Sequence, residues 1–198
     1  MPPLVLRPTA WRMVCTALFA LLLANLAPKA EAAESVYTKI VFDACETLSL
    51  AEEDGSVSLR CAGYRDIPIF YNEGDLRADI DFGAPNEEFA TFGGFNSVGP
   101  TVEWRLDGGR PIAAIIRFFV RSADGGADGQ VLSVHKVGQP KAPGCVVAYV
   151  DARANRNANE LARDVADARV PGFACGRDRP AYVGKVGPSG QGATAVER

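Results

Sequence analysis

Apolar and polar residues alternate along much of the chain beyond residue 33, and this alternation predicts β-strands. The clearest case is segment 56–61, where one face is apolar and the other polar: Val57, Leu59 and Cys61 against Ser56, Ser58 and Arg60. A period of two is typical of a strand with one buried face. Segment 35–45 predicts a preceding strand, and we expect the two strands to form a hairpin that brings Cys45 close to Cys61.

Two more strands are predicted on either side of a turn at 72–75. In the second of them, apolar and polar residues again take turns: Leu76, Ala78, Ile80 and Phe82 alternate with Arg77, Asp79 and Asp81. Carboxylates on a strand most often face solvent. We therefore expect Asp79 and Asp81 to lie on the wet face of this strand rather than in a catalytic cleft.

The strongest local signal is a pair of apolar runs that flank two glycines, which is typical of a β-hairpin. A three-residue loop, 108–110, places Trp104 opposite Ala114, so that opposed residues share one face. The apolar face then consists of Val102, Trp104, Leu106, Ile112, Ala114, Ile116 and Phe118. Glu103, Arg105 and Arg117 lie together on the other face, where Glu103 and Arg117 could form an exposed ion pair.

Beyond this hairpin, segments 130–137 and 144–152 predict two further strands. The period then changes to helical spacing, with apolar positions at Ala158, Leu161, Ala162, Val165 and Ala168. Asn157 and Glu160 resemble a capping box at the start of this helix, and Pro171 ends it. Residues 181–198 are rich in glycine, proline and polar residues without periodicity, so we expect a disordered tail there.

The combined pattern predicts an α+β fold. We expect a single curved antiparallel sheet of about six to eight strands, with one C-terminal helix packed on it. Residues 33–180 form the single domain, and they are numerous enough to bury a sizeable core.

Residues 1–32 have the three parts of a secretory signal peptide. Arg7 and Arg12 precede a short apolar run, 13–27, and Ala30 and Ala32 then provide small residues in an A-x-A arrangement. The run is shorter than the roughly 20 residues that span a bilayer. We expect cleavage after Ala32 and no membrane span thereafter, so that the protein is periplasmic or secreted.

The charge of the processed chain disfavours nucleic acid as a partner. Of the 21 basic and 24 acidic residues, the signal peptide holds Arg7, Arg12, Lys29 and Glu31, which leaves 18 basic and 23 acidic residues. No basic block remains to follow a phosphate backbone. The only histidine, His135, lies in a predicted strand without a ligand cluster or a phosphate loop nearby in sequence, so no cofactor or metal is expected.

Four cysteines remain after processing, and an even number in an exported chain predicts two disulfides. Three connectivities are possible. We favour Cys45–Cys61 and Cys145–Cys175, because each pair flanks one local unit. Each bond would then stabilise the fold by roughly 3–4 kcal/mol in the chain-entropy model.

Three stretches carry a resemblance to known proteins: CAGYRDIPIFYNEGDLR, EWRLDGGRPIAAIIRFF and CVVAYVDARANRNANELAR, followed by Cys175. They resemble a group of small exported proteins of Gram-negative bacteria. The resemblance covers most of the chain after the signal peptide. It implies a periplasmic address and a shared fold, but neither an activity nor a catalytic residue.

Our leading functional hypothesis is a non-enzymatic binding or interaction module for an unknown periplasmic small molecule or protein. It rests on the lack of a nucleophile motif, a metal set or a histidine partner in the sequence. The ligand-binding surface is predicted where aromatic and charged residues adjoin, at Tyr64, Arg65, Asp66, Tyr71 and Trp104.

Two alternatives have a different chemistry. A hydrolase acting on cell-wall glycan would use two carboxylates from Glu73, Asp75, Asp79 and Asp81 as acid and base. An inhibitor of an exogenous hydrolase would need a protruding loop, for which 89–100 is the candidate.

Overall fold

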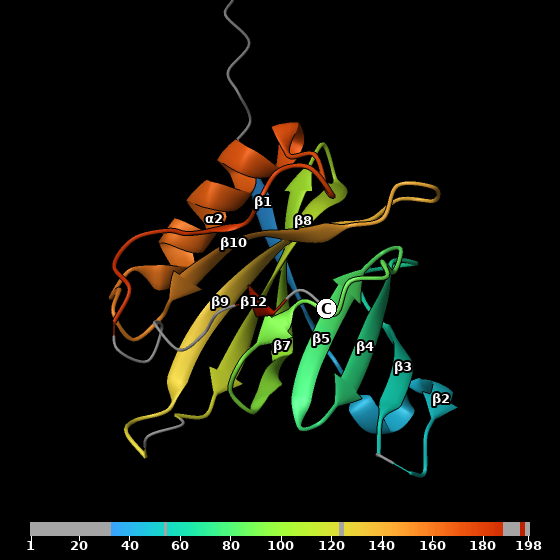
Figure 1. The fold of residues 1–198 in the computed structure, drawn as a ribbon. Coiled ribbons are helices and arrows are strands. Elements are labelled where there is room, and N and C mark those ends of the chain that lie inside the picture. The colour runs from blue at the N-terminus through green and yellow to red at the C-terminus, as the bar shows by residue number, and fades with distance from the viewer. Residues whose placement is uncertain (1–32, 54, 123–124, 188–194, 197–198) are drawn as a thin grey trace, which may run out of the picture. The chain divides into compact units, whose positions relative to one another are not determined.

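A computed structural model describes residues 33–53, 55–122, 125–187 and 195–196. The described residues from Ala33 onward belong to one unit. The unit consists mostly of β-sheet with one C-terminal helix, which confirms the predicted α+β class (Figure 1). The predicted signal peptide lies outside the described residues.

The strands divide between a six-stranded sheet and a four-stranded sheet. The larger sheet has the order β1-β7-β8-β9-β10-β11: Glu34–Lys39, Asn96–Asp107, Arg110–Val120, Gly129–Lys136, Cys145–Asp151 and Ala181–Tyr182. Its neighbours are antiparallel except for β10 and β11. The smaller sheet has the order β2-β3-β4-β5: Glu46–Leu50, Val57–Ala62, Pro68–Gly74 and Arg77–Phe82. A short pair joins β6, Thr91–Phe92, to β12, Ala195–Val196.

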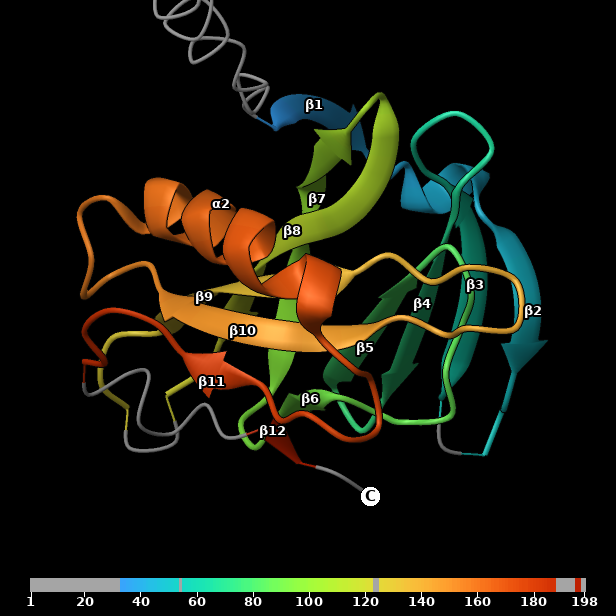
Figure 2. The same cartoon turned by 90° about the horizontal axis from the view of Figure 1, so that it is seen from above.

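The six-stranded sheet is the middle layer, because both of its faces are covered (Figure 2). Helix α2, Ala158–Arg169, packs on one face over β9 and β10. The four-stranded sheet packs on the other face, where Trp104, Phe82, Phe92 and Phe118 are fully buried. Period-two strands supply this core because one side of each points inward.

Strand β5 joins the two sheets at both of its ends. The Gly138 N–H donates to the Phe82 carbonyl at 2.7 Å, and the Asn96 N–H donates to the Leu76 carbonyl at 2.9 Å. These bonds use backbone groups that would otherwise be left at a sheet edge. The two sheets therefore wrap around one shared core.

The predicted hairpin between 35–45 and 56–61 is wrong. Strand β1 pairs with β7, where Val36 lies opposite Trp104, and β3 pairs with β2. A 3₁₀ turn over Phe42–Ala44 separates β1 from β2, so the chain leaves one sheet and enters the other there. Both favoured disulfides are nonetheless confirmed, at Cys45–Cys61 and Cys145–Cys175.

The predicted register of the β7–β8 hairpin is confirmed away from the loop, where Trp104 lies opposite Ala114. Beside the loop it is wrong, because Leu106 lies opposite Pro111 and Ile112 packs with the core cluster on the α2 side of the sheet. Its loop is shorter than predicted, with two residues instead of three. Gly108 and Gly109 have φ angles of 55° and 77°, which favour glycine and suit a tight hairpin turn. An irregularity between Arg105 and Leu106 then shifts the strands back into the predicted register.

Helix α2 confirms the predicted helix, although the Asn157 side chain makes no capping hydrogen bond. The face expected to be solvated, with Glu103 and Arg105, is the face that α2 covers. The tail expected to be disordered from residue 181 begins instead with β11, which pairs in parallel with β10. A parallel neighbour was not predicted because the 3₁₀ turn and following loop that return the chain to this edge have no periodicity.

Candidate functional site

The five residues predicted to bind a ligand do not form one site. Trp104 is fully buried in the core, and its indole Nε1 donates to Thr38 Oγ1 at 2.8 Å. Tyr64, Arg65 and Asp66 line a small cavity of about 190 Å³ near the β7–β8 turn. The Arg65 guanidinium lies 5.0 Å from the centre of the Tyr64 ring, so these two side chains form a cation–π contact with each other.

Tyr71 lies elsewhere, because it belongs to the far part of β4. Its ring packs edge-on against Phe42 with centroids 5.1 Å apart. Burial, followed by the charge of Glu73, raises the pKa of Tyr71 to about 12. Tyr71 lines a cavity of about 390 Å³, which we call the distal cavity; its other lining residues are Glu73, Leu76, Phe95, Asn96, Ser97, Phe119, Arg121 and Asp128.

A different cavity adjoins helix α2, and we call it the helix cleft. Its volume is about 330 Å³. It is lined by α2 and by the six-stranded sheet. Tyr37 of β1 and Phe119 of β8 are among its walls, and Asn159 and Arg163 descend from α2. The rest of its lining comes from the sheet: Gly99, Pro100, Thr101, Glu103, Ile115, Arg117 and Leu132.

The hollow in the sheet has a local cause in strand β7. Val98 lies opposite Phe118, and Val102 lies opposite Ile116, so the three residues 99–101 stand against the single residue Arg117. Such a bulge bends one strand and redirects side chains, and bulges are frequent beside functional sites. On the β7 side, no single residue therefore lies opposite Arg117, whose partner on β9 is Leu132.

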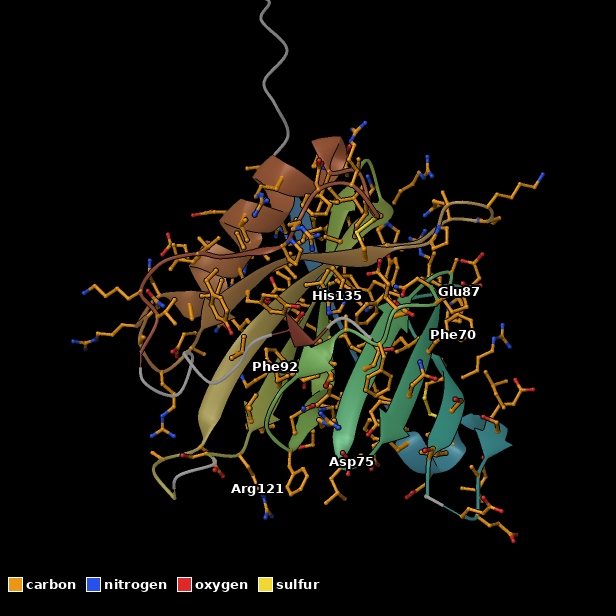
Figure 3. The ribbon with its side chains drawn as sticks, in the orientation of Figure 1. Phe70, Asp75, Glu87, Phe92, Arg121 and His135 are labelled. Atoms are coloured by element: carbon orange, nitrogen blue, oxygen red, sulfur yellow. A yellow bond between two sulfur atoms is a disulfide. The ribbon has the colours of Figure 1, made fainter. Side chains whose placement is uncertain are left out.

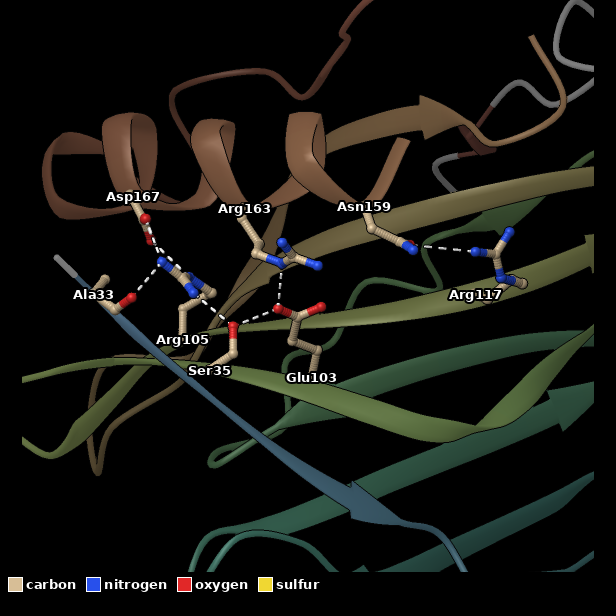
Figure 4. Close-up of polar contacts among 8 residues, drawn as sticks. All are labelled: Ala33, Ser35, Glu103, Arg105, Arg117, Asn159, Arg163 and Asp167. Carbon is tan, nitrogen blue, oxygen red and sulfur yellow. Dashed lines mark hydrogen bonds and ion pairs between the residues drawn. The ribbon is translucent and has the colours of Figure 1, made fainter. Parts of the chain in front are cut away.

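Arg117 is the most distinctive residue of the helix cleft. Its Nη1 donates to Gln130 Oε1 at 3.1 Å. Its Nη2 donates to Asn159 Oδ1 at 3.4 Å, as Figure 4 shows. Both acceptors are neutral amides, and Arg117 makes no ion pair within the described part of the chain. Burial lowers the pKa of its guanidinium. A half-buried cation without an anion is unfavourable, and an anionic ligand would correct this.

The other charges at this interface are already paired (Figure 4). Arg163 Nε of α2 donates to Glu103 Oε1 of β7 at 2.7 Å, and Arg105 Nε donates to Asp167 Oδ1 at 2.9 Å. Ser35 bridges the two pairs, because its hydroxyl contacts both Glu103 and Arg105. The expected pair of Glu103 with Arg117 is therefore not formed. Glu103 is paired with Arg163 instead, so Arg117 has no carboxylate partner among the residues that the structure describes.

The largest of the four cavities has a less suitable lining. It measures about 760 Å³ and lies beside the Cys145–Cys175 disulfide. Its one cation is Lys136, whose ammonium already donates to the Phe173 carbonyl at 2.7 Å. Glu87 and Glu88 add negative charge to the wall. The polar groups of this cavity therefore indicate the charge of a ligand less clearly than Arg117 does in the helix cleft.

Asp79 and Asp81 are buried, so the expectation that they face solvent is wrong. The segment after β5 folds back over them: Asp79 accepts from the Ala90 N–H at 3.1 Å, and Asp81 accepts from the Asn86 N–H at 3.1 Å. Burial is the main cause that raises the pKa of Asp79 to about 6 and of Asp81 to about 7. Neither residue lines any of the four cavities described above.

The carboxylates considered for a hydrolase do not converge on one of these cavities. Glu73 lines the distal cavity, and Asp75 is exposed and paired with Arg77. Asp79 and Asp81 serve as anchors for the segment that covers them. Segment 89–100 does not protrude as an inhibitor loop either, because it contains β6 and the start of β7, with Thr91 and Phe92 buried.

His135 faces the core between the two sheets and not a cavity (Figure 3). Its Nε2 lies 2.8 Å from Ser133 Oγ, and its ring packs against Phe82 with centroids 5.0 Å apart. Burial lowers the pKa of His135 to about 3. The Ser133–His135 pair is thus sealed from substrate, and its role is to complete the core.

The chain was compared with protein-family models, curated proteins and solved structures, and none of them matches it. Among the described residues, no group of three or more histidine, cysteine, aspartate or glutamate side chains is arranged to hold a metal ion. No helix in the same part of the chain is long and apolar enough to cross a membrane.

The sequence pattern does not single out Arg117 as a ligand contact, because Arg117 lies on the face of the hairpin that the pattern predicts to be exposed. One signal was present. Gly99-Pro100 interrupts an otherwise strand-like stretch, and a glycine followed by proline inside a strand marks a bulge. The partner elements that turn this bulge into a cleft, α2 and β1, come from distant parts of the chain.

Proposed function

We propose that the protein is an exported binding module that captures a ligand carrying a carboxylate on a partly apolar body. The observation that carries this proposal is the half-buried Arg117, which has no anionic partner among the described residues and lies on the floor of the helix cleft. Its two disulfides suit an oxidising compartment outside the cytoplasm.

The chemistry of the helix cleft matches such a ligand. A guanidinium has five N–H donors in a planar fork, and hydrogen bonds to neutral amides occupy only two of them here. A carboxylate can accept two parallel hydrogen bonds from the remaining donors. The exposed rings of Tyr37 and Phe119 would cover the apolar part of the ligand. Apolar walls with a few placed polar groups are typical of small-molecule sites.

Binding of a small probe is expected to be weak. One charge-assisted contact contributes about 1.5–3 kcal/mol, and a single ring adds an apolar contribution of similar size. The dissociation constant of a simple aryl carboxylate is therefore expected near the millimolar range. NMR titration measures affinities of this kind directly.

The test is a titration of the ¹⁵N-labelled, processed protein with benzoate, followed through backbone amides of β8 and the Nε–H of Arg117. Benzyl alcohol is the neutral control ligand. Arg117→Gln removes the cation, and Arg110→Gln is the matched control because Arg110 lies exposed at the other end of the same strand.

Saturable benzoate shifts around Arg117 that vanish in Arg117→Gln and persist in Arg110→Gln would support the proposal. Equal shifts with benzyl alcohol would show that the cleft reads only the ring and would overturn it. Benzoate shifts that map away from the helix cleft, or none up to high millimolar concentration, would also overturn it.

A further inference from the structure

Three exposed aromatic rings line the helix cleft and the distal cavity. Tyr37, Phe95 and Phe119 have exposed fractions of 55%, 48% and 42%, and they are the only aromatic residues among the exposed large hydrophobic residues of the described chain. Tyr37 lines the helix cleft, Phe95 lines the distal cavity, and Phe119 lines both. Exposed aromatic rings that gather in this way mark a contact surface.

The two cavities adjoin each other, because neighbouring residues of the same strands line both of them. On β7, Asn96 and Ser97 line the distal cavity, while residues 99–101 line the helix cleft. Near the end of β8, Arg117 and Phe119 lie at alternate positions, and Arg121 follows directly after Val120, the last residue of the strand. Arg117 and Arg121 are thus separated by four strand rises, about 13 Å. We call the two adjoining cavities the groove.

The polar groups differ between the two halves of the groove. The helix cleft carries Arg117 and Arg163 against one carboxylate, Glu103. The distal cavity carries Glu73 and Asp128 against one cation, Arg121. The ligand must therefore place its negative charge over Arg117 and its neutral, hydrogen-bonding part in the distal cavity, where carboxylate and amide oxygens accept hydroxyl hydrogens.

We propose that the groove binds an oligosaccharide in which a carboxylated sugar is flanked by neutral sugar rings. Aromatic side chains stack on the apolar faces of sugar rings, while the neighbouring polar side chains take the hydroxyl groups. This inference rests on the proposed function, because the carboxylated sugar occupies the site of Arg117. A uniformly charged polymer is disfavoured by Glu73 and Asp128, which repel it in the distal half.

The experiment is isothermal titration with a hyaluronan tetrasaccharide, whose uronate rings alternate with neutral amino-sugar rings. Glucuronate tests the carboxylated sugar alone, and chitotetraose tests a neutral chain of the same length. Phe95→Ala probes the distal cavity, since Phe95 does not line the helix cleft. Leu50→Ala is the matched control, because Leu50 is an exposed apolar residue on β2.

We expect the tetrasaccharide to bind at least about tenfold more tightly than glucuronate, because it engages both cavities. Phe95→Ala should weaken tetrasaccharide binding about five- to tenfold, the usual worth of one aromatic contact, and leave benzoate binding unchanged. Leu50→Ala should change neither. Arg117→Gln should abolish tetrasaccharide binding.

The outcomes separate this inference from the proposed function. If benzoate binds at Arg117 but the tetrasaccharide binds no better than glucuronate, the groove inference fails and the proposed function stands. The groove inference also fails if Phe95→Ala leaves the affinity for the tetrasaccharide unchanged, or if chitotetraose binds as tightly as the tetrasaccharide. If a single-stranded oligonucleotide binds more tightly than the tetrasaccharide, the groove responds to polyanions in general, and this result would overturn the groove inference. If neither benzoate nor any saccharide binds, both proposals fail.

Discussion

The guanidinium of Arg105 on β7 meets the carboxylate of Asp167 on α2, with Nε 2.9 Å from Oδ1. A second nitrogen of the same guanidinium donates to the Ala33 carbonyl at 2.7 Å. One buried side chain thus fastens the first described residue of the chain, the middle of the sheet and the helix to one another. The hydrogen bond to Asp167 is the main cause that raises the pKa of Arg105.

Asp167→Ala should destabilise the protein, because it leaves the Arg105 guanidinium buried without its anion. We expect a loss of about 1–3 kcal/mol in the free energy of unfolding, since Asp167 itself is partly exposed. Urea unfolding followed by circular dichroism measures it. Asp164→Ala, an exposed acid on the same helix, is the control and should cost less than about 0.5 kcal/mol. Equal effects of the two variants would contradict a specific role of this pair.

The buried carboxylates of Asp79 and Asp81 should make the protein less stable as the pH rises. Their pKa values in the folded state, about 6 and about 7, lie above the ordinary value of 3.8. Folding therefore takes up protons, so the stabilisation is complete below pH 3.8 and is lost as the pH rises through 6 to 7. At about 1.4 kcal/mol for each pKa unit, the loss is on the order of 3–4 kcal/mol for each carboxylate.

Asp81→Asn removes one of these titrations and keeps an oxygen that can accept the Asn86 N–H. The decline in unfolding free energy between pH 4 and 7 should become shallower in this variant, as measured by urea unfolding at several pH values. Asp178→Asn, at an exposed acid outside this cluster, should leave the slope unchanged. An identical slope in wild type and Asp81→Asn would refute the assignment.

His135 should act in the opposite direction. Its pKa is lowered from 6.5 to about 3 in the folded state, so the contribution of the neutral imidazole is present above pH 6.5 and lost as the pH falls toward 3. His135→Gln removes this dependence while retaining a polar group near Ser133. The rise in stability from pH 7 to pH 4 that we assign to the aspartates should be steeper in this variant. A shallower rise would contradict the buried, neutral histidine.

The two disulfides should differ in where their loss is felt. They close loops of 16 and 30 residues, and each should contribute about 3–4 kcal/mol by restricting the unfolded chain. Cys145→Ser with Cys175→Ser should also loosen the segment after α2, because Cys175 ties it to β10. Hydrogen exchange should therefore rise over 170–176 in this double variant. Cys45→Ser with Cys61→Ser should leave exchange there unchanged and raise it at the 3₁₀ turn Phe42–Ala44 and in β2 instead.

Export can be tested by intact mass. Expression of the full chain in a Gram-negative host should yield periplasmic protein that begins at Ala33 and is four hydrogens lighter than its reduced form. Ala30→Leu with Ala32→Leu should block processing, because small residues are needed before the cleavage point. Recovery of the full-length chain in the cytoplasm without disulfides would contradict the predicted address.

The sequence by itself was enough for those features that depend on local order. The period-two pattern predicts the strands of six or more residues, the 3.6 period predicts α2, and the paired cysteines flank local units. The β7–β8 register was also predictable, because opposed residues in a hairpin must share a face. Each of these relations joins residues that are close in the chain, so the pattern of side chains contains the answer.

Only the tertiary structure decided which surfaces are covered. Asp79 and Asp81 alternate with apolar residues as any half-exposed strand would, and their burial depends on the later segment that folds over them. Arg117 is a site candidate because the β7 bulge, β1 and α2 meet around it while Glu103 is held by Arg163. These contacts join residues that are far apart in sequence. The local pattern of apolar and polar residues contains no information about which distant segment will pack against it.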